Sequence, residues 1–359
     1  MAVPAFDPKE LNVVSERPGY FGSAAIPIYD FPVKPKEAYK ALYRRQPVWQ
    51  ITGIESQMFC PKINPDNIAR AFVVDGSGMK LGEGGGIDMF GIDWEYIEQV
   101  GGSMVRPGKP YLDDANEWKE RVIWPDIDKW DWEQAAAENK EFLSGDNFIM
   151  CWIMNGWYER LISFMDFENA AYAMIDEDQQ DAVKEIYDKL SDLYIRLIDK
   201  YLHYFPQING FCIHDDWGSQ RETFFSPALA AEMIVPAMKK VTDYLHSRDI
   251  FCDLHSCGQL FKQIPNMIAA GWDSWSGQAM NDTHKIYELY GDKLLIGVIP
   301  EAYDPETKSD DEQCEAAKNY AAAFCNPKKP CITSAYSSGV LTPVYRAELY
   351  KQSRINFSK

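Results

Sequence analysis

Histidine, cysteine and aspartate side chains gather in two short segments of this 359-residue chain. The first segment reads Cys212-Ile-His-Asp-Asp-Trp-Gly-Ser-Gln220 and the second reads Cys252-Asp-Leu-His-Ser-Cys-Gly258. Imidazole, thiolate and carboxylate groups are the ligands that zinc takes in proteins, and they also transfer protons during catalysis. The two segments therefore predict metal-assisted or acid–base chemistry.

Each segment begins where a short apolar run, 208–213 or 250–254, comes to an end. Between them Ser226 is a helix-capping residue, and Pro227 suits the first helical position. Parallel strands joined by a helix end at the same edge of a sheet, where α/β proteins keep their active sites. We therefore expect five side chains to share one rim: His214, Asp215, Asp216, His255 and Cys257.

Three of these residues are candidate catalytic groups: Asp216, Asp215 and His214. Adjacent carboxylates at a strand end shift one another's pKa values, as acid–base catalysis requires, although either aspartate would also cap the following helix. His255 and Cys257 are candidate metal ligands. The alternative for this pair is a histidine hydrogen-bonded to the backbone beside a buried thiol.

Aromatic residues are predicted at several strand ends. Together they would form a flat apolar pocket for a ring-bearing substrate, whereas each one alone is as well explained by core packing. These residues are Trp152, Trp217, Trp275 and Tyr336.

The order of the elements predicts the fold class. Strands are expected at 147–153, 273–276, 294–299 and 331–335, and helices at 157–165, 178–204, 259–270, 282–290, 310–324 and from Pro343 onward. Short strands that alternate with longer helices indicate an α/β protein with a parallel sheet, here a (β/α)8 TIM barrel. We expect 1–46 to be an extension packed on the barrel and 47–359 to be the barrel, with a first strand at 47–51 and an irregular excursion at 75–135.

Composition limits the partners and the compartment. The net charge of −18 argues against nucleic acid and against anionic membrane surfaces. No apolar run approaches the roughly 20 residues that span a bilayer, and the first residues lack the pattern of a signal peptide. The eight cysteines are scattered, as in a reducing compartment. We therefore expect a cytoplasmic protein with small-molecule or protein partners.

Seven motifs, in this order, give the chain a family resemblance: Arg45-x-Pro-Val-Trp49, Asp216-x-Gly-x-Gln220, Ser226-Pro with Pro236, His255-Ser-Cys-Gly258, Gln278, Gly297 with Pro300, and Ser338-Gly-x-x-Thr-Pro343. Their order and spacing resemble the uroporphyrinogen decarboxylase superfamily. The resemblance implies a TIM barrel and places Gln220 and Gln278 among the substrate-binding residues. It covers most of the chain from residue 45 onward and is weakest over 62–140.

The superfamily contains decarboxylases and corrinoid-dependent methyltransferases. The decarboxylases bind the carboxylates of a porphyrinogen with paired arginines after the Pro-Val-Trp strand, but here the loop 50–57 has no arginine. His255-Ser-Cys257 is similar to the zinc motif of the methyltransferases that methylate a thiol such as coenzyme M. The methyltransferase branch is therefore the expected one, and its members imply Zn²⁺ as a cofactor.

The third zinc ligand of the thiol-methylating members is a cysteine, and Ser338 stands at that position here. Candidates for the missing ligand are Glu301, which directly follows the predicted strand 294–299, and Asp216 or His214. An enzyme that removes methyl from oxygen or nitrogen holds no thiolate substrate and tolerates this change better. We therefore favour the demethylating side, for example with a methoxylated aromatic donor in anaerobic metabolism.

The resemblance implies a partner, because the chain lacks the Asp-x-His-x-x-Gly motif that binds a corrinoid. The cobalt corrinoid would arrive on a separate corrinoid protein, and the other partner would be a small-molecule methyl donor or acceptor. Two alternatives stay open: a decarboxylase related to the uroporphyrinogen enzymes, and a non-catalytic barrel that binds a tetrapyrrole or a corrinoid protein.

Overall fold

A computed structural model describes residues 4–17, 25–80, 82–98, 102–334 and 339–358. The chain divides into two compact units. One unit contains the described residues of 1–57, 146–148 and 273–359, and the other contains 58–145 and 149–272. Neither boundary lies at residue 46, where the predicted extension ends.

The unit formed by 58–145 and 149–272 holds three parallel strands in the order β9-β8-β7. β3 (Ser56–Phe59) lies next to β7, and the chain passes from the other unit into this one within β3. The three parallel strands are β7 (Phe148–Ile153), β8 (Ile208–His214) and β9 (Phe251–His255). β7 and β8 are buried on both faces, which explains their largely apolar sequences, whereas β9 alternates buried and half-buried residues. The predicted strands at 147–153, 208–213 and 250–254 are thus confirmed within one residue at each end.

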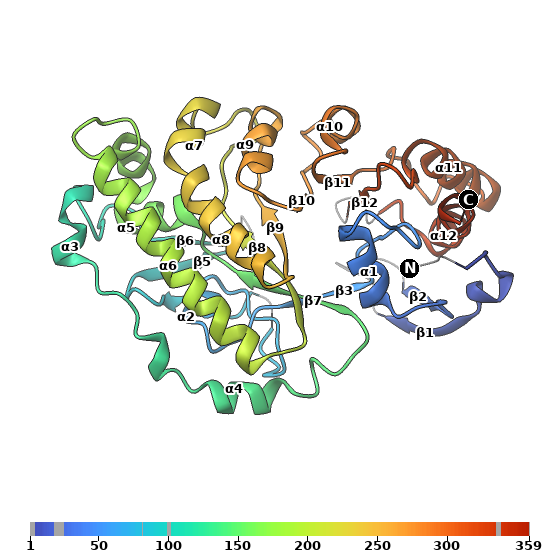
Figure 1. The fold of residues 1–359 in the computed structure, drawn as a ribbon, viewed down its shortest axis with the longest axis horizontal. Coiled ribbons are helices and arrows are strands. Elements are labelled where there is room, and N and C mark those ends of the chain that lie inside the picture. The colour runs from blue at the N-terminus through green and yellow to red at the C-terminus, as the bar shows by residue number, and fades with distance from the viewer. Residues whose placement is uncertain (1–3, 18–24, 81, 99–101, 335–338, 359) are drawn as a thin grey trace. The chain divides into compact units, whose positions relative to one another are not determined.

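Helices connect these strands in the β–α–β manner that the spacing predicts. After β7 come α5 (Trp157–Ala173) and α6 (Gln180–Tyr204), after β8 come α7 (Pro227–Met233) and α8 (Val235–Ser247), and after β9 come a 3-10 turn (Phe261–Gln263) and α9 (Ile264–Ala269). Ser226 caps α7, and Pro227 occupies its first position. Figure 1 shows α5, α6 and α8 running over the strands of this unit.

The predicted excursion 75–135 forms a small antiparallel sheet followed by short helices. The sheet has the order β4-β5-β6, from β4 (Gly86–Ile87), β5 (Asp93–Ile97) and β6 (Gly102–Val105). α2 (Pro65–Ala69) precedes this segment. After the sheet come 3-10 turns at Ala115–Glu117 and Ile127–Lys129 and the helices α3 (Trp118–Arg121) and α4 (Trp132–Asn139).

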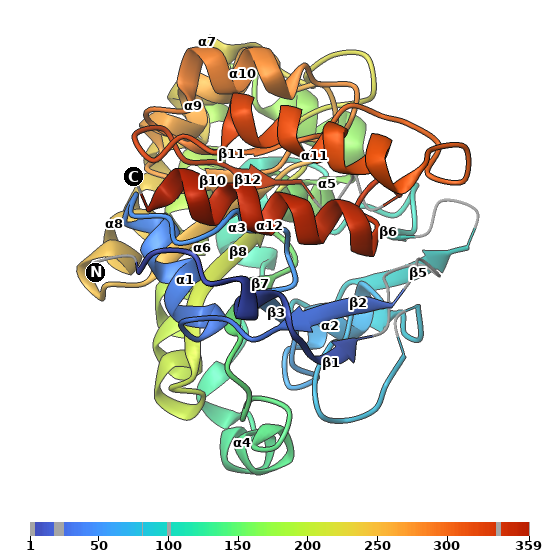
Figure 2. The same ribbon diagram turned by 90° about the vertical axis from the view of Figure 1, so that its right-hand side faces the viewer.

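The unit formed by 1–57, 146–148 and 273–359 repeats the β–α alternation. Its parallel strands have the order β12-β11-β10, from β10 (Ser274–Trp275), β11 (Leu295–Val298) and β12 (Ile332–Thr333). The helices are α10 (Thr283–Tyr290), α11 (Asp310–Phe324) and α12 (Pro343–Phe357). Figure 2 shows α11 and α12 side by side.

The N-terminal segment packs on α12 of the same unit. It contains a 3-10 turn (Pro8–Leu11), an antiparallel pair of β1 (Val13–Arg17) and β2 (Ile26–Tyr29), and α1 (Pro35–Tyr43). Arg354 of α12 donates two hydrogen bonds to the carboxylate of Glu10, at 2.7 and 2.9 Å. Tyr350 donates a third at 2.6 Å.

The predicted first strand at 47–51 is wrong, because this buried segment forms no strand ladder. Side chains take its backbone groups instead: Gln50 N donates to Ser353 Oγ at 2.9 Å. One backbone bond is present, from Thr333 N to Ile51 O at 2.9 Å. The observed α/β alternation is that of a TIM-like fold, and closure into an eight-stranded barrel stays a prediction.

Candidate functional site

Two histidines stand side by side at the ends of neighbouring strands. His214 is the last residue of β8 and His255 the last residue of β9, and the two are direct partners in the parallel register. Their rings stack with centroids 4.9 Å apart and planes 13° from parallel. Strand pairing therefore fixes the separation of the two imidazoles.

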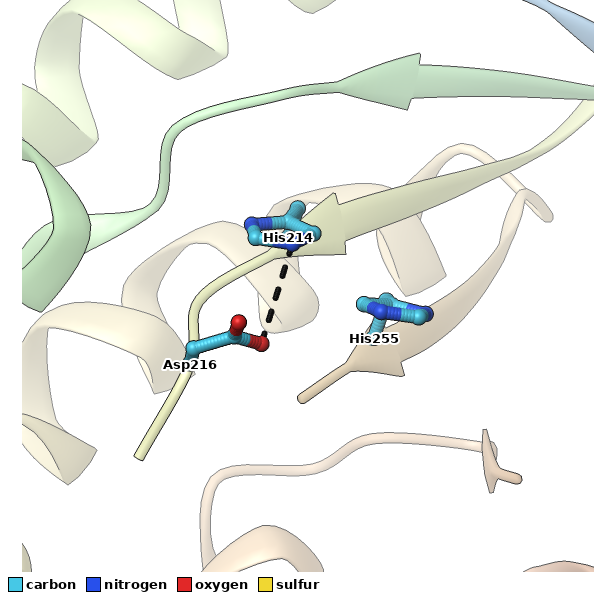
Figure 3. Close-up of side chains that lie close together, drawn as sticks. All are labelled: His214, Asp216 and His255. Atoms are coloured by element: carbon cyan, nitrogen blue, oxygen red, sulfur yellow. Dashed lines mark ion pairs between the residues drawn. The ribbon is translucent and has the colours of Figure 1, made fainter. Parts of the chain in front are cut away.

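Asp216 completes a cluster with these histidines (Figure 3). Its Oδ1 lies 3.7 Å from His214 Nε2 and accepts a hydrogen bond from Cys257 N at 2.6 Å. One ligand atom from each of His214, Asp216 and His255 lies within 4.8 Å of the others. The predicted convergence of the two strand ends is thus observed, and the cluster can hold a metal ion.

Burial and charge give the cluster its protonation state. Burial lowers the pKa of His255 to about 4, aided by repulsion from His214 and Arg70 and opposed by the carboxylate of Asp216. Burial alone would raise the pKa of Asp216, but the two imidazoles and the Cys257 N–H outweigh it and lower that pKa. At neutral pH the site therefore offers a neutral imidazole on His255 and a carboxylate on Asp216, the forms that bind metals.

Cys257 lies beside the cluster. Its Sγ is 3.3 Å from His255 Nε2, and burial, followed by the negative charge of Asp216, raises the pKa of the thiol to about 12. Cys257 does not belong to the group whose ligand atoms all lie within 4.8 Å of one another. It is a protonated thiol beside the three ligand groups at neutral pH in the metal-free protein.

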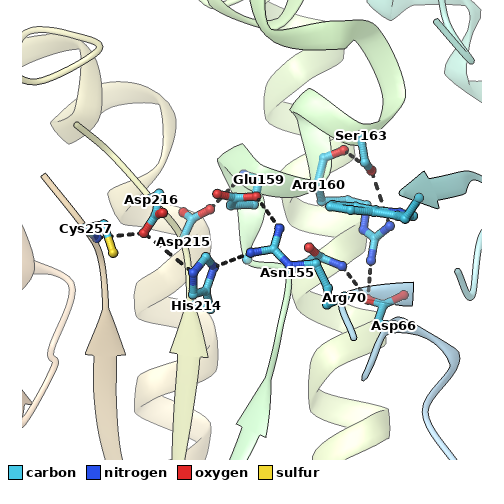
Figure 4. Close-up of polar contacts among 12 residues, drawn as sticks. Asp66, Arg70, Asn155, Glu159, Arg160, Ser163, His214, Asp215, Asp216 and Cys257 are labelled. Atoms are coloured by element: carbon cyan, nitrogen blue, oxygen red, sulfur yellow. Dashed lines mark hydrogen bonds and ion pairs between the residues drawn. The ribbon is translucent and has the colours of Figure 1, made fainter. Parts of the chain in front are cut away.

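An ion pair that the sequence did not indicate faces the other side of His214 (Figure 4). Arg70, which follows α2, places Nη2 3.5 Å from His214 Nδ1 and donates from Nη1 to Glu159 at 2.9 Å. Both side chains of the pair are nearly buried, and Arg70 also lies 5.0 Å from the ring centroid of Trp94. The two partners lie 89 residues apart in the sequence, so no local sequence pattern predicts their pairing.

Asp215 turns to the protein interior. Its two carboxylate oxygens accept from Glu159 N at 2.9 Å and from Trp217 Nε1 at 2.8 Å, and its side chain is fully buried. Burial raises its pKa to about 8. These contacts describe a residue that positions the start of α5, and its predicted catalytic role stays a prediction.

The approach of Asp215 to α5 depends on Gly156. A Cβ on Gly156 would lie 2.5 Å from the Cβ of Asp215, closer than such atoms come in proteins. Gly156 N donates to His214 O at 2.6 Å, so the glycine also ties α5 to the end of β8. A small residue is therefore required where helix and strand meet.

A second charge cluster lies deeper in the same unit. Arg160, fully buried on α5, donates to Asp88 at 2.5 Å and pairs with Asp66 of α2. Asn155 donates to Asp66 at 3.0 Å. Because α2 precedes Arg70 and α5 carries Glu159, this cluster fixes the two elements that deliver the ion pair facing His214.

One of the predicted aromatic residues lies beside the histidines, and the pocket itself stays a prediction. Trp152 is half-buried, with its ring centroid 5.3 Å from that of His255 and 6.4 Å from that of Phe72. Trp217 is fully buried and packs edge-on to Phe225 at 5.8 Å, and Gln220 is exposed. Trp152 is thus the aromatic residue that the structure brings to the histidines, while the substrate roles of the other two stay predictions.

Three predicted site residues belong to the other unit, and a fourth lies outside the described residues. Gln278, Trp275 and Glu301 belong to the other unit, where Trp275 is fully buried and Glu301 has an exposed side chain 3.7 Å from His284 Nδ1. Tyr336 lies outside the described residues, as does Ser338. The assignment of Glu301 as a metal ligand stays a prediction.

The donor set fits a divalent metal such as zinc. Two imidazoles and a carboxylate with a neighbouring thiol are all zinc ligands, and two histidines with one carboxylate form a recurrent metal-binding triad. The lowered pKa values of His255 and Asp216 keep these groups free of competing protons at neutral pH.

Comparisons with known proteins identify the fold. No family model and no curated protein matches the chain. Among solved structures, a methyltransferase from Methanosarcina mazei matches with a TM-score of 0.57 and 15% identity, over 89% of this chain and 98% of that chain. The chain has the fold of that methyltransferase. At this identity the likeness is one of fold alone.

A further match is too remote to support an argument. It is the spore cortex-lytic enzyme SleL of Bacillus megaterium QM B1551, with a TM-score of 0.24 and 8% identity over 55% of this chain and 46% of that chain. Within the part of the chain that the structure describes, no helix combines the length and the apolar character that a membrane crossing needs.

Proposed function

We propose that the protein is a methyltransferase that moves a methyl group between a small molecule and the cobalt corrinoid of a separate protein, with zinc held by His214, Asp216 and His255. The observation that supports this most is the convergence of these three ligands, with Cys257 beside them, at the ends of β8 and β9. The shared fold with a methyltransferase supports the reaction class.

Zinc bound there would polarise the oxygen or nitrogen that loses the methyl group. The residues supply the remaining functions. His214, Asp216 and His255 would hold the metal, and the proton that the leaving heteroatom gains comes from solvent. Trp152 offers a ring face beside His255 for an aromatic donor. The methyl group passes to the corrinoid of the partner as the leaving heteroatom gains its proton.

The demethylating direction is favoured by the ligand set. In the metal-free protein burial and the charge of Asp216 raise the pKa of the Cys257 thiol to about 12, and this thiol is not among the three ligands. A site that methylates a thiol must hold a thiolate substrate, and the two histidines and one carboxylate already provide three ligands, so an oxygen donor fits the remaining position.

Metal content tests the proposal directly. The wild-type protein should contain stoichiometric zinc by plasma mass spectrometry, and His255→Ala should lose it while keeping its circular dichroism spectrum. The matched control is His203→Ala, which removes an exposed histidine of α6. Under anaerobic conditions the wild type should transfer methyl to cob(I)alamin from at least one methoxylated or methylated amine donor.

Other outcomes would contradict the proposal. Zinc content that is equal in wild type and His255→Ala would remove the metal from this cluster. A protein with neither zinc nor methyl transfer, which still binds a corrinoid protein, would be a non-catalytic carrier.

A further inference from the structure

A cavity of about 350 Å³ lies within the unit that carries α10, α11 and α12. Its walls are His284 of α10, Glu301 after β11, and one side of α11 with Asn319, Tyr320 and Phe324. This volume lies within the roughly 300–1,000 Å³ that small-molecule pockets occupy. None of these residues belongs to the histidine cluster at β8 and β9.

The imidazole of His284 is fixed in orientation. Its Nε2 lies 2.8 Å from Ile299 O, a carbonyl that can only accept, so Nε2 carries the proton when the ring is neutral. Ile299 N in turn donates to Thr283 Oγ1 at 3.0 Å. Nδ1 of the neutral ring therefore presents a lone pair to the cavity side.

Glu301 stands next to that lone pair. Its Oε1 lies 3.7 Å from His284 Nδ1, beyond the range of a good hydrogen bond, and 91% of its side chain is exposed. The two acceptors therefore lie near each other without a hydrogen bond between them. A group that brings several N–H donors and a positive charge would satisfy both acceptors at once.

The lining next to His284 is aromatic. The centroid of Phe324 lies 4.7 Å from that of His284 and 4.9 Å from that of Tyr320. Aromatic faces attract cations, and the attraction is stronger when the pair is desolvated. The same rings would contact the apolar part of a ligand.

We propose that this cavity binds a small organic ammonium ion, a primary or secondary amine with an apolar substituent. The ammonium group would bridge His284 Nδ1 and the carboxylate of Glu301, and the substituent would lie against Phe324 and Tyr320. This inference goes beyond the methyl-transfer proposal, because the site needs neither the metal nor the residues around it.

A fluorine-labelled probe tests the proposal. We would titrate 4-fluorobenzylammonium against protein freed of metal with EDTA, follow binding by fluorine NMR, and compare 4-fluorobenzyl alcohol, which has the same ring and no charge. The amine should bind about tenfold more tightly than the alcohol. Glu301→Gln should abolish that preference, whereas Glu306→Gln, which removes an exposed carboxylate of the same loop outside the cavity wall, should keep it.

Three results would overturn the proposal: equal binding of amine and alcohol, an amine affinity of Glu301→Gln equal to that of Glu306→Gln, or loss of amine binding in His255→Ala. The last result would place the amine at the histidine cluster. Phe324→Leu provides a second variant and should weaken the amine more than the alcohol. Because the assay uses metal-free protein, its outcome is independent of whether the methyl-transfer proposal holds.

Discussion

The guanidinium of Arg70 bears on how His214 can bind a metal. Because Arg70 only donates, His214 Nδ1 accepts from it and the neutral ring carries its proton on Nε2, facing Asp216. A histidine that ligates zinc through Nε2 has the opposite protonation and donates from Nδ1 to an acceptor. Metal binding at Nε2 would therefore require Arg70 to turn away toward Glu159, its partner at 2.9 Å.

We expect Arg70→Met to bind zinc about tenfold more tightly, because the change removes a cation and an opposing donor beside the site. Competition with a fluorescent chelator measures this affinity. Arg121→Met is the matched control, since Arg121 forms an exposed pair with Glu117. Weaker zinc binding in Arg70→Met would show instead that Arg70 holds His214 in its ligating position.

Asp215 predicts a pH dependence of stability. Its folded pKa of about 8 exceeds the ordinary value of about 3.9, so the folded protein keeps a proton that the unfolded chain releases. Its stabilisation is full below about pH 3.9 and is lost as the pH rises through 8, by up to about 1.4 kcal/mol per pH unit. His255, with a folded pKa of about 4, acts in the opposite direction between about pH 4 and 6.5.

Between about pH 6.5 and 8 the stability therefore changes with the titration of Asp215 and no longer with that of His255. In urea unfolding of metal-free protein, wild-type stability should fall across this window, and Asp215→Asn should show a smaller fall. Parallel pH profiles of the two proteins would mean that Asp215 is ionised in the folded state.

At the scale of elements, the junction of β7, α5 and β8 controls the site, because α5 carries Glu159 and is positioned through Asp215. Apolar runs predicted these strands correctly, since buried parallel strands are apolar throughout. The helix predicted at 310–324 is observed at these bounds, where Ser309 and Glu312 form a capping box. The prediction of a strand from an apolar run failed at 47–51, where hydrogen bonds that involve side chains replace the backbone ladder.

Gly156→Ala tests this junction. The added methyl group would meet Asp215 Cβ at 2.5 Å, so we expect a loss of about 1–3 kcal/mol in the free energy of unfolding. Gly145→Ala is the control, since its Cβ would have no atom within 4 Å. Equal urea midpoints for the two variants would show that α5 shifts to relieve the clash with no loss in the free energy of unfolding.

At the scale of the whole chain, the sequence predicted the α/β alternation and a shared rim for five side chains, because strand ends follow from apolar runs and parallel topology. Three of the five, His214, Asp216 and His255, form the cluster, whereas Asp215 turns to the interior. Arg70 and Glu159 were missed because contacts between distant segments leave no local pattern. The division into an extension at 1–46 and a barrel at 47–359 stays a prediction, and Glu10 of the N-terminal segment accepts a hydrogen bond from Arg354 of α12.

The net charge of −18 predicts that salt stabilises the protein. Salt screens the repulsion among the excess carboxylates, which stabilises the folded protein. Salt also weakens the exposed ion pairs, but each of these contributes little to stability. The urea midpoint at neutral pH should rise between about 10 mM and 150 mM sodium chloride, as the Debye length falls from about 30 to 8 Å. A falling midpoint would show that the ion pairs dominate.

The pairing of His214 with His255 on one rung has a consequence for assembly of the chain. Sliding β8 past β9 by a single residue would turn one imidazole to the opposite side of the sheet and dismantle the cluster. Cobalt(II), whose visible absorption changes on coordination, would then colour refolding protein only after the two strands reach native alignment. The candidate metal site would thus serve as a spectroscopic probe of the step in which β8 and β9 align.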